Sequence, residues 1–223
     1  MCGRFTLVSP YVAVTERFHA PAPAALRPRY NIAPGQDVLC VVADGARRFE
    51  PMRWGLIPSW AKDPAIGHRL INARAETLAE KPSFRRAFAK RRCLIAADGF
   101  YEWRPVGKRK VPAYVFLKSG RPFGLAGLYE TWRTPDGNKI CTCTIVTTGA
   151  NDLVRLIHDR MPVIVPEGVE NRWLDPAEGD LGRLQALLTP YPAAEMDAYD
   201  VTPVVNSTAH DAPDCILPAR TGS

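Results

Sequence analysis

Short apolar runs rich in β-branched and aromatic residues recur along the chain, separated by clusters of proline and glycine. These runs predict strands at Val38–Ala43, Arg92–Ala97, Ala113–Lys118, Phe123–Tyr129, Lys139–Thr147 and Met161–Val165. Helical spacing of apolar residues is confined to shorter segments at Tyr11–Phe18, Ser83–Lys90, Asn151–Ile157, Gly168–Leu174 and Leu181–Leu188. The predicted strands therefore outnumber the helices and mostly follow one another without a long helix between them.

Turn signals join several of these strands directly. Val106–Lys110 is placed as a hairpin loop would be, and Thr134–Lys139 carries an Asp-Gly turn. This pattern favours an α+β fold with a twisted, mostly antiparallel and barrel-like sheet flanked by short helices. Because no repeat, low-complexity tract or long linker divides the chain, we expect one domain over residues 1–223, with about residues 219–223 disordered.

Composition narrows the class of protein. With 46% hydrophobic and 23% charged residues, the chain is typical of soluble globular proteins. No run approaches the roughly 18 apolar residues of a membrane helix, and the first residues lack the pattern of a secretory signal. We therefore expect a cytoplasmic protein that does not contact membranes.

Charge and cysteine content leave more than one class of partner open. Lysine and arginine number 29 against 23 aspartates and glutamates, a net charge of +6 that permits an anionic partner without requiring one. The six cysteines include no CxxC pair, and without a secretory signal they are not expected to form a disulfide framework. Cys141 and Cys143 share one face of a predicted strand, as two small core residues would. We expect no metal and no cofactor.

Cys2 is the first candidate for chemistry. Its position allows removal of the initiator methionine, which would leave an α-amine and a thiol on one residue. Reference pKa values of about 7.7–8.0 for the amine and about 8.5 for the thiol make both partly nucleophilic near neutral pH. An aldehyde could form a Schiff base with the amine, and the thiol could close it to a thiazolidine. Alternatively, Cys2 is only a small residue that begins a buried strand.

Polar residues also interrupt three apolar segments. In an extended Leu70–Thr77, Asn72, Arg74 and Glu76 share one face, either as a solvated edge or as groups that orient an amine and hold a phosphate. Glu102 stands between Tyr101 and Trp103, where desolvation would raise its pKa for proton transfer, or where it lies exposed on an edge strand.

The third such residue is His158, which ends a predicted helix directly before a strand. It could act as an acid or base whose tautomer is fixed by a nearby acceptor. It could equally complement the negative end of the helix. None of these single positions identifies a function.

The combination of these positions with the surrounding motifs does indicate a function. The chain contains MCGR (Met1–Arg4), RYNIAPGQ (Arg29–Gln36), RWGLIPSW (Arg53–Trp60), INARAET (Ile71–Thr77), ADGFYEW (Ala97–Trp103), IHDRMPVIV (Ile157–Val165) and the late segment YDVTPVVNS (Tyr199–Ser207). In order and spacing these segments resemble the SRAP family (SOS-response-associated peptidase, also called abasic site processing protein) over nearly the whole chain.

The resemblance implies a sensor of abasic sites in single-stranded DNA that becomes covalently linked to the lesion through Cys2 after Met1 is removed. It implies that Asn72 positions the cysteine amine and that Glu102 and His158 belong to the active site. The residues expected to bind DNA are Arg4, Arg74, Trp60 and Trp103. Trp60 is followed by Ala61, where relatives can carry a second tryptophan, so the contact with the base stack is expected to differ in detail.

The expected chemistry is lyase-like Schiff-base formation, shielding the lesion from strand cleavage, by a monomer that is associated with the nucleoid through DNA. A thiol peptidase using Cys2, His158 and Asn72 is the main alternative, and cleavage of its own Met1–Cys2 bond would reconcile the two readings. A non-covalent single-strand-binding module, in which Cys2 is inert, is the third.

Overall fold

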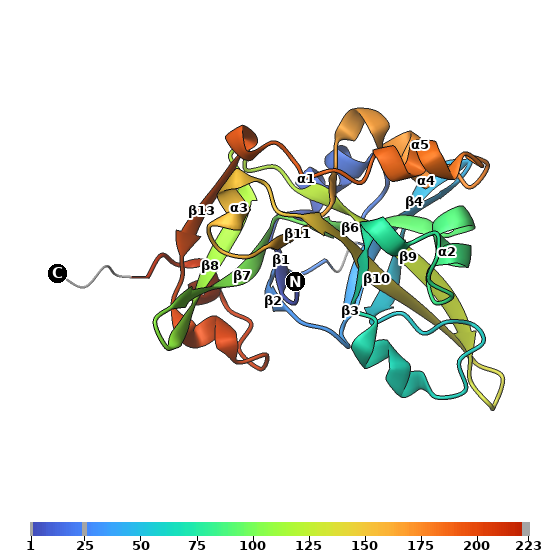
Figure 1. Cartoon of the computed structure of the whole chain (residues 1–223), viewed down its shortest axis with the longest axis horizontal. Helices are drawn as coiled ribbons and strands as arrows, with labels where there is room; N and C mark the ends of the chain where they lie inside the picture. Colours follow the sequence, from blue (N-terminus) through green and yellow to red (C-terminus); the bar gives the residue numbers. More distant parts are fainter. Residues whose placement is uncertain (1, 24–25, 220–223) are drawn as a thin grey trace.

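A computed structural model describes residues 2–23 and 26–219 of the chain. Two sheets form the body of the protein (Figure 1). In the first, five strands close into a barrel because β10 pairs with both β4 and β9. The strands of this barrel are β3 (Asp37–Asp44), β4 (Ala46–Trp54), β6 (Arg92–Ala97), β9 (Phe123–Arg133) and β10 (Lys139–Gly149). All of its pairings are antiparallel except that between β10 and β4.

Three short strands extend the barrel. β5 (Asn72–Arg74) runs parallel to β10, with Asn72 opposite Ile145. β11 (Arg160–Pro162) pairs with the end of β10, and β12 (Ile164–Val165) pairs with the start of β9. β5 and β11 therefore lie at the same end of β10, which brings the segment after Ile71 close to the segment after His158.

The second sheet is open and antiparallel, in the order β13-β8-β7-β1-β2. Its strands are β1 (Phe5–Leu7), β2 (Arg29–Ile32), β7 (Gly99–Val106), β8 (Arg109–Leu117) and β13 (Met196–Asp200). β7 and β8 form a hairpin in which Val106 faces Arg109 and Gly107 adopts a φ of 59°, which glycine tolerates best.

The two sheets meet where β6 passes into β7. Asp98 lies between these strands, and its carboxylate accepts hydrogen bonds of 2.5 and 2.8 Å from the backbone N–H groups of Val8 and Ser9. Across the junction the ring of Phe5 packs edge-on against Trp54, with 5.2 Å between centroids, and both side chains are buried. The chain before β1 is thereby fixed between the barrel and the open sheet.

Short helices cover the outside of the sheets (Figure 1). The α-helices are α1 (Tyr11–Phe18), α2 (Arg85–Lys90), α3 (Asp152–Arg155), α4 (Glu170–Leu174) and α5 (Leu181–Ala186). The 3-10 turns are η1 (Pro64–Arg69), η2 (Ala75–Thr77), η3 (Glu167–Val169), η4 (Ala193–Glu195), η5 (Pro203–Asn206) and η6 (Pro213–Ile216). Among the described residues, no helix has the length and apolar character needed to cross a membrane.

A buried ion network ties α1 and α4 to the barrel. Glu170 is 1% exposed and accepts from Arg17 at 2.7 Å and from Arg47 of β4 at 2.8 Å. Arg17, itself 4% exposed, also lies 3.2 Å from Glu167. Each buried charge therefore has an opposite charge beside it, which burial requires.

The structure confirms the predicted α+β class with mostly antiparallel, barrel-like sheet. The predicted helix Tyr11–Phe18 and strand Arg92–Ala97 have the observed bounds, whereas the strands β1, β2, β4 and β13 were not predicted. The predicted extended run from Leu70 to Thr77 is wrong beyond Arg74, because η2 begins at Ala75 and turns Glu76 away from the strand. One domain stays a prediction, and the expected disorder at the C-terminus falls mainly on residues 220–223, outside the described residues.

Candidate functional site

Cys2 is separated from β1 by Gly3 and Arg4 and is fully buried. Its backbone carbonyl accepts a hydrogen bond of 2.8 Å from the side-chain amide of Asn72, which opens β5. The Oδ1 atom of Asn72 is also buried and has no hydrogen-bond donor among the described residues. The parallel pairing of β5 with β10 thus delivers a polar amide to the start of a chain segment that is seventy residues away in sequence.

Glu102 lies close to Cys2 from the neighbouring strand β7. It is 2% exposed, so the reading of Glu102 as an exposed edge residue was wrong. Burial raises the pKa of the Glu102 carboxyl, against a smaller opposing effect of His158. Burial likewise raises the pKa of the Cys2 thiol, and the nearby Glu102 charge raises it further. Both groups are therefore held toward their protonated forms.

His158 reaches the same site from the segment between α3 and β11. Its Nδ1 lies 2.8 Å from the Asp159 carboxylate and 3.0 Å from the backbone N–H of Arg160. Nδ1 can accept from that N–H only when it carries no proton, and it can donate to Asp159 only when it does. The two contacts suit different placements of the proton on Nδ1, and the acid–base reading and the helix-end reading of His158 both stay predictions.

Arg160 is a site residue to which the sequence analysis gave no role. Only 14% of its side chain is exposed, and its two terminal nitrogens contact Glu76 at 2.6 and 3.0 Å. It also donates to the backbone carbonyl of Thr147 at 2.8 Å. The hydrogen bonds from Arg160 lower the pKa of the Glu76 carboxyl, and the positive charge of Arg160 lowers it further. The signal in the sequence that could have identified Arg160 is its position two residues after His158 in the IHDRMPVIV motif.

Arg4 occupies a socket formed by segments far apart in sequence. Its Nη1 donates to Asn31 at 2.8 Å and to the backbone carbonyl of Val205 at 2.7 Å. Its guanidinium lies 5.7 Å from the centre of the Trp103 ring, a cation–π distance. Trp103 in turn donates from its indole nitrogen to Asn206 at 2.8 Å. Arg4 and Trp103 are thus brought together, and Asn31 was not singled out in the sequence.

Arg74 and Trp60 lie further toward solvent. Arg74 ends β5 opposite Thr147 and is exposed. Trp60 is 54% exposed, and its loop is fixed by a 2.8 Å hydrogen bond from the buried Trp132 indole to the carbonyl of Ala61. Exposed cations and a large exposed aromatic ring can contact a polyanion that carries stacked bases.

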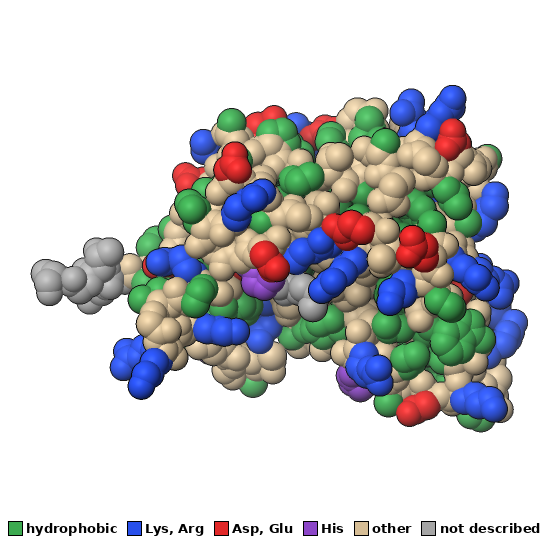
Figure 2. All heavy atoms as spheres, in the orientation of Figure 1, with side chains coloured by type: hydrophobic (Ala, Val, Ile, Leu, Met, Phe, Trp, Pro, Cys, Tyr) green, Lys and Arg blue, Asp and Glu red, His purple; other side chains and the backbone are tan. Residues whose placement is uncertain are grey.

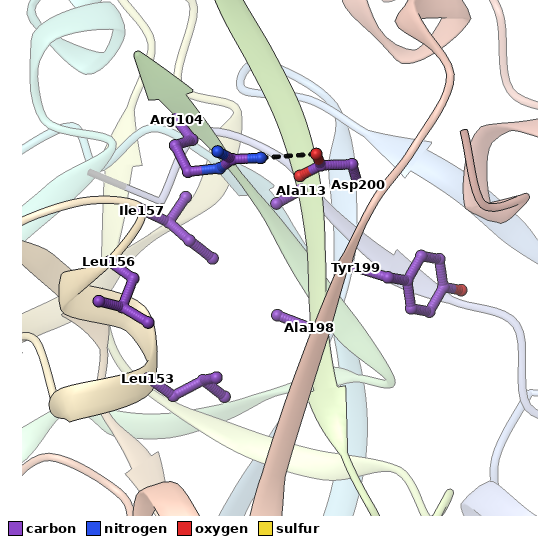
Figure 3. Close-up of a pocket in the computed structure, with 8 residues that line it drawn as sticks. All are labelled: Arg104, Ala113, Leu153, Leu156, Ile157, Ala198, Tyr199 and Asp200. Atoms are coloured by element: carbon purple, nitrogen blue, oxygen red, sulfur yellow. Dashed lines mark hydrogen bonds and ion pairs between the residues drawn. The ribbon is translucent and has the colours of Figure 1, made fainter. Parts of the chain in front are cut away.

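Two hollows flank the ridge formed by Leu156 and Ile157. One, of about 420 Å³, is lined by that ridge together with Trp103, Pro105, Lys110, Arg155, His158 and Asp159. The other, of about 480 Å³, separates α3 from β13, and the Arg104–Asp200 ion pair of 2.6 Å closes one end while the Tyr199 ring points away from it (Figure 3). Leu156 itself is 74% exposed.

Basic, acidic and apolar side chains are mixed on the face of the protein that Figure 2 shows. Figure 2 shows Lys and Arg side chains on either side of a histidine near the centre of the view, with acidic side chains interspersed. The described residues thus place a thiol, a carboxyl, an imidazole and an amide together, beside cations that can hold an anion.

Comparison with known proteins assigns the chain to a family. The sequence pattern of the family described as "SOS response associated peptidase (SRAP)" matches residues 1–208. The chain belongs to the SRAP family. The match includes Cys2, Asn72, Glu102 and His158 and extends through the Arg4 socket.

Two relatives of this SRAP chain share the descriptive name "abasic site processing protein". It is 49% identical over 221 residues to the abasic site processing protein YoqW of Bacillus subtilis, covering 97% of this chain and 99% of that protein. It is 32% identical over 230 residues to the abasic site processing protein HMCES of Gallus gallus, covering 88% of this chain and 68% of that protein.

Solved structures share the fold of the SRAP chain. A protein from Bacteroides thetaiotaomicron superimposes with a TM-score of 0.89 at 28% identity, covering 98% of this chain and all of the other. A phage-related protein from Bordetella bronchiseptica gives a TM-score of 0.71 at 29% identity, covering 90% of this chain and 94% of the other.

Proposed function

We propose that this SRAP protein recognises abasic sites in single-stranded DNA and links itself covalently to them through Cys2. The names of its relatives support abasic-site processing as the activity. The observation that carries the covalent step is the hydrogen bond from Asn72 to the Cys2 carbonyl, at a thiol that lies close to the buried carboxyl of Glu102. This set of groups suits the chemistry of an amine and a thiol on one residue better than it suits simple strand binding.

The reaction begins with cleavage of the Met1–Cys2 peptide bond, which consumes one water and frees the Cys2 amine. The amine attacks C1′ of the ring-opened abasic sugar, and loss of one water gives an imine. The Cys2 thiol then adds to the imine carbon and its proton passes to the nitrogen, which closes a thiazolidine. The complete linkage step therefore releases one water for each adduct.

The polar groups around Cys2 take separate parts in this sequence. Asn72 holds the Cys2 backbone so that the amine faces the incoming sugar. Glu102, with its raised pKa, gives a proton to the departing hydroxyl and takes one from the amine. His158 assists opening of the sugar by moving the hydroxyl proton. The closed ring prevents the imine from expelling the 3′ phosphate, so the strand stays intact.

The DNA strand is held mainly through its phosphates. Arg4 and Arg74 are the proposed phosphate contacts, with a sequence-independent and salt-sensitive contribution to affinity. Trp60 and Trp103 provide aromatic faces for bases, each stack contributing about 1–3 kcal/mol. An abasic nucleotide in a single strand is also easy to turn into a pocket because it has no base to unstack.

Intact-protein mass spectrometry tests the proposal. The protein is mixed with single-stranded DNA that contains one abasic site, beside a Cys2→Ala variant and a Cys141→Ala variant that removes a half-buried cysteine elsewhere. A protein without Met1 that gains the mass of the DNA minus one water, in wild type and Cys141→Ala only, is the expected result. Equal adduct in Cys2→Ala would refute the assignment of Cys2.

The same experiment separates the alternatives. A non-covalent binding module would shift the DNA in a gel without any adduct, and would do so equally in Cys2→Ala. A peptidase that acts only on its own chain would lose Met1 and form no adduct.

A further inference from the structure

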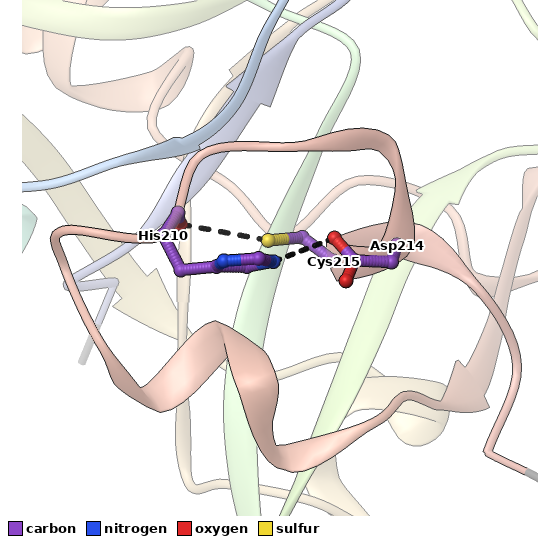
Figure 4. A group of neighbouring side chains, drawn as sticks. All are labelled: His210, Asp214 and Cys215. Carbon is purple, nitrogen blue, oxygen red and sulfur yellow. Dashed lines mark hydrogen bonds and ion pairs between the residues drawn. The ribbon is translucent and has the colours of Figure 1, made fainter.

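Three side chains with different donor atoms converge in the C-terminal segment, away from the Cys2 site. His210, Asp214 and Cys215 each present one nitrogen, oxygen or sulfur atom, and these atoms all lie within 4.8 Å of one another (Figure 4). The His210 Nε2 atom is 2.7 Å from the Asp214 Oδ1 atom, and the Cys215 thiol donates to the His210 carbonyl at 3.6 Å. The proposed DNA chemistry uses none of the three.

The spacing is close to that of a zinc site. With metal–ligand bonds of about 2.0–2.3 Å, tetrahedral donors stand roughly 3.3–3.6 Å apart. The His210–Asp214 pair would therefore open by about half an ångström, and the Cys215 sulfur would approach by up to about one. His210 and Asp214 have side-chain exposures of 40% and 45%, so these two side chains can make most of the movement, toward the buried Cys215.

The backbone that carries these donors is held from several directions. The Asn31 amide donates to the carbonyls of Ser207 and His210 at 2.9 and 2.6 Å. The Asp211 carboxylate accepts from the N–H of Asn31 at 2.9 Å. On the far side of the cluster, the hydroxyl of Tyr199 donates to the carbonyl of Ile216 at 2.7 Å. A metal would meet three donors on a segment that is already ordered, so little conformational entropy opposes its binding.

We propose that His210, Asp214 and Cys215 bind a divalent zinc ion, with solvent water as the fourth ligand. One nitrogen, one carboxylate oxygen and one thiolate form a donor set that suits zinc better than the oxygen-preferring Mg²⁺ or Ca²⁺. Binding releases the thiol proton of Cys215 and replaces the His210–Asp214 hydrogen bond by two metal bonds. The exposed side of His210 and Asp214 leaves the fourth position open to water.

The ion would brace the socket of Arg4. The segment that it closes, residues 210–215, follows soon after Val205, whose carbonyl accepts from Arg4, and Asn206, which accepts from Trp103. Zinc is thus inferred to stabilise the C-terminal segment against β2 and to keep these two side chains in place. The sequence-based expectation of no metal rested on ligand spacing, and the fold places together donors that lie in an unusual H-x3-D-C arrangement.

Metal titration of the full-length protein tests the site. Cobalt(II) is used as a coloured substitute for zinc, because a thiolate ligand gives a charge-transfer band in the near ultraviolet. The titration is made in a Cys2→Ala background, since the N-terminal aminothiol could itself bind cobalt. Cys215→Ser and His210→Ala are compared with Cys141→Ser, which removes a thiol outside the cluster.

The proposal expects one equivalent of cobalt with a thiolate band, competed by zinc, in the parent and in Cys141→Ser. Loss of a ligand should weaken binding by more than the roughly 10–100-fold that loss of an outer-shell partner costs. Zinc at about 100 times its Kd should raise Tm by roughly 5–10 °C in the parent only. Unchanged cobalt binding in both ligand variants, or no binding by the parent, would overturn the proposal.

A variant that fails to fold is recognised by its circular dichroism, and His210→Ala, a half-exposed position, then carries the test. Because the titrations use Cys2→Ala, their outcome is independent of the proposed DNA crosslink. A protein that crosslinks DNA and binds no zinc contradicts only the metal site, and the reverse result contradicts only the proposed function.

Discussion

The side-chain amide of Asn72 donates a 2.8 Å hydrogen bond to the backbone carbonyl of Cys2. The contact fixes the residue that carries both proposed nucleophiles without touching either the amine or the thiol. Asn72 is itself fixed, because β5 is held against β10. The position of Cys2 therefore depends on strand pairing in the barrel, and its proposed chemistry involves Glu102 in the other sheet.

Replacing Asn72 by alanine should slow the crosslink and leave strand binding unchanged. A single neutral hydrogen bond contributes about 0.5–1.5 kcal/mol, which corresponds to a rate reduction of roughly 2–13-fold. The measurement is the single-turnover rate of adduct formation, with the Kd for undamaged single-stranded DNA measured in parallel. Asn138→Ala, in the β9–β10 turn, is the matched control. A slower adduct that is fully explained by weaker DNA binding would contradict a positioning role.

Replacing Glu102 by glutamine should stabilise the fold at neutral pH. The folded-state pKa of Glu102 is raised by burial, so wild-type stability increases as pH falls through that pKa and levels off below the unfolded value of about 4.3. Glutamine resembles the protonated form and lacks this dependence. The variant should thus melt a few degrees above wild type at pH 7–8, at about 2–4 °C per kcal/mol, and the difference should shrink toward pH 4–5.

Thermal melts across that pH range provide the check, and Glu80→Gln at an exposed position is the control. A difference in Tm that grows as pH falls would mean that the folded state stabilises the charged carboxylate. Glu102→Gln is also expected to crosslink more slowly, so stability and activity should move in opposite directions.

The sequence was most informative where a residue's neighbours along one strand decide its environment. Glu102 was singled out because Tyr101 and Trp103 flank it, and of the two readings left open, buried or exposed, the structure shows it buried. β4 was not recognised, because Arg47, Arg48 and Glu50 fill a strand whose outer face meets solvent and whose inner face meets other segments. Charge pairing with distant residues, such as Arg47 with Glu170, makes that strand compatible with the fold and has no local signal.

The contacts within the candidate site could not be predicted from the local sequence pattern for a similar reason. Asn72 meets Cys2 only because two strands pair in parallel, and Arg4 meets Val205 across 201 positions of sequence. The resemblance to the SRAP family supplied the residues that are proposed to act together. It did not supply the contacts, such as Arg160 with Glu76, that hold those residues in place.

The buried ion network should be the most sensitive electrostatic element of the fold. Glu170→Ala would leave Arg17 and Arg47 without their shared partner, and breaking a buried pair costs about 3–5 kcal/mol. We expect Tm to fall by roughly 10 °C, with crosslinking preserved well below the new Tm. Glu50→Ala, which removes a half-buried partner of the exposed Arg48, should change stability by no more than about 1 kcal/mol. Equal Tm values for Glu170→Ala and Glu50→Ala would show that the ion pairs of Glu170 contribute no more to stability than a surface ion pair does.

Gly127 tests how closely the barrel interior is packed. A Cβ at this position of β9 would stand 2.7 Å from the Cys93 sulfur, so Gly127→Ala should destabilise the protein by about 1–3 kcal/mol through overpacking. Gly168→Ala, where no atom lies within 4 Å of the added Cβ, is the control. Removing the sulfur with Cys93→Ala should recover part of the loss in the double variant, because the new methyl group then occupies the space left by the thiol. Additive losses in urea unfolding would place the strain of Gly127→Ala in the other contact of the new Cβ, with the Ile95 side chain at 3.1 Å, instead of in the Cys93 contact.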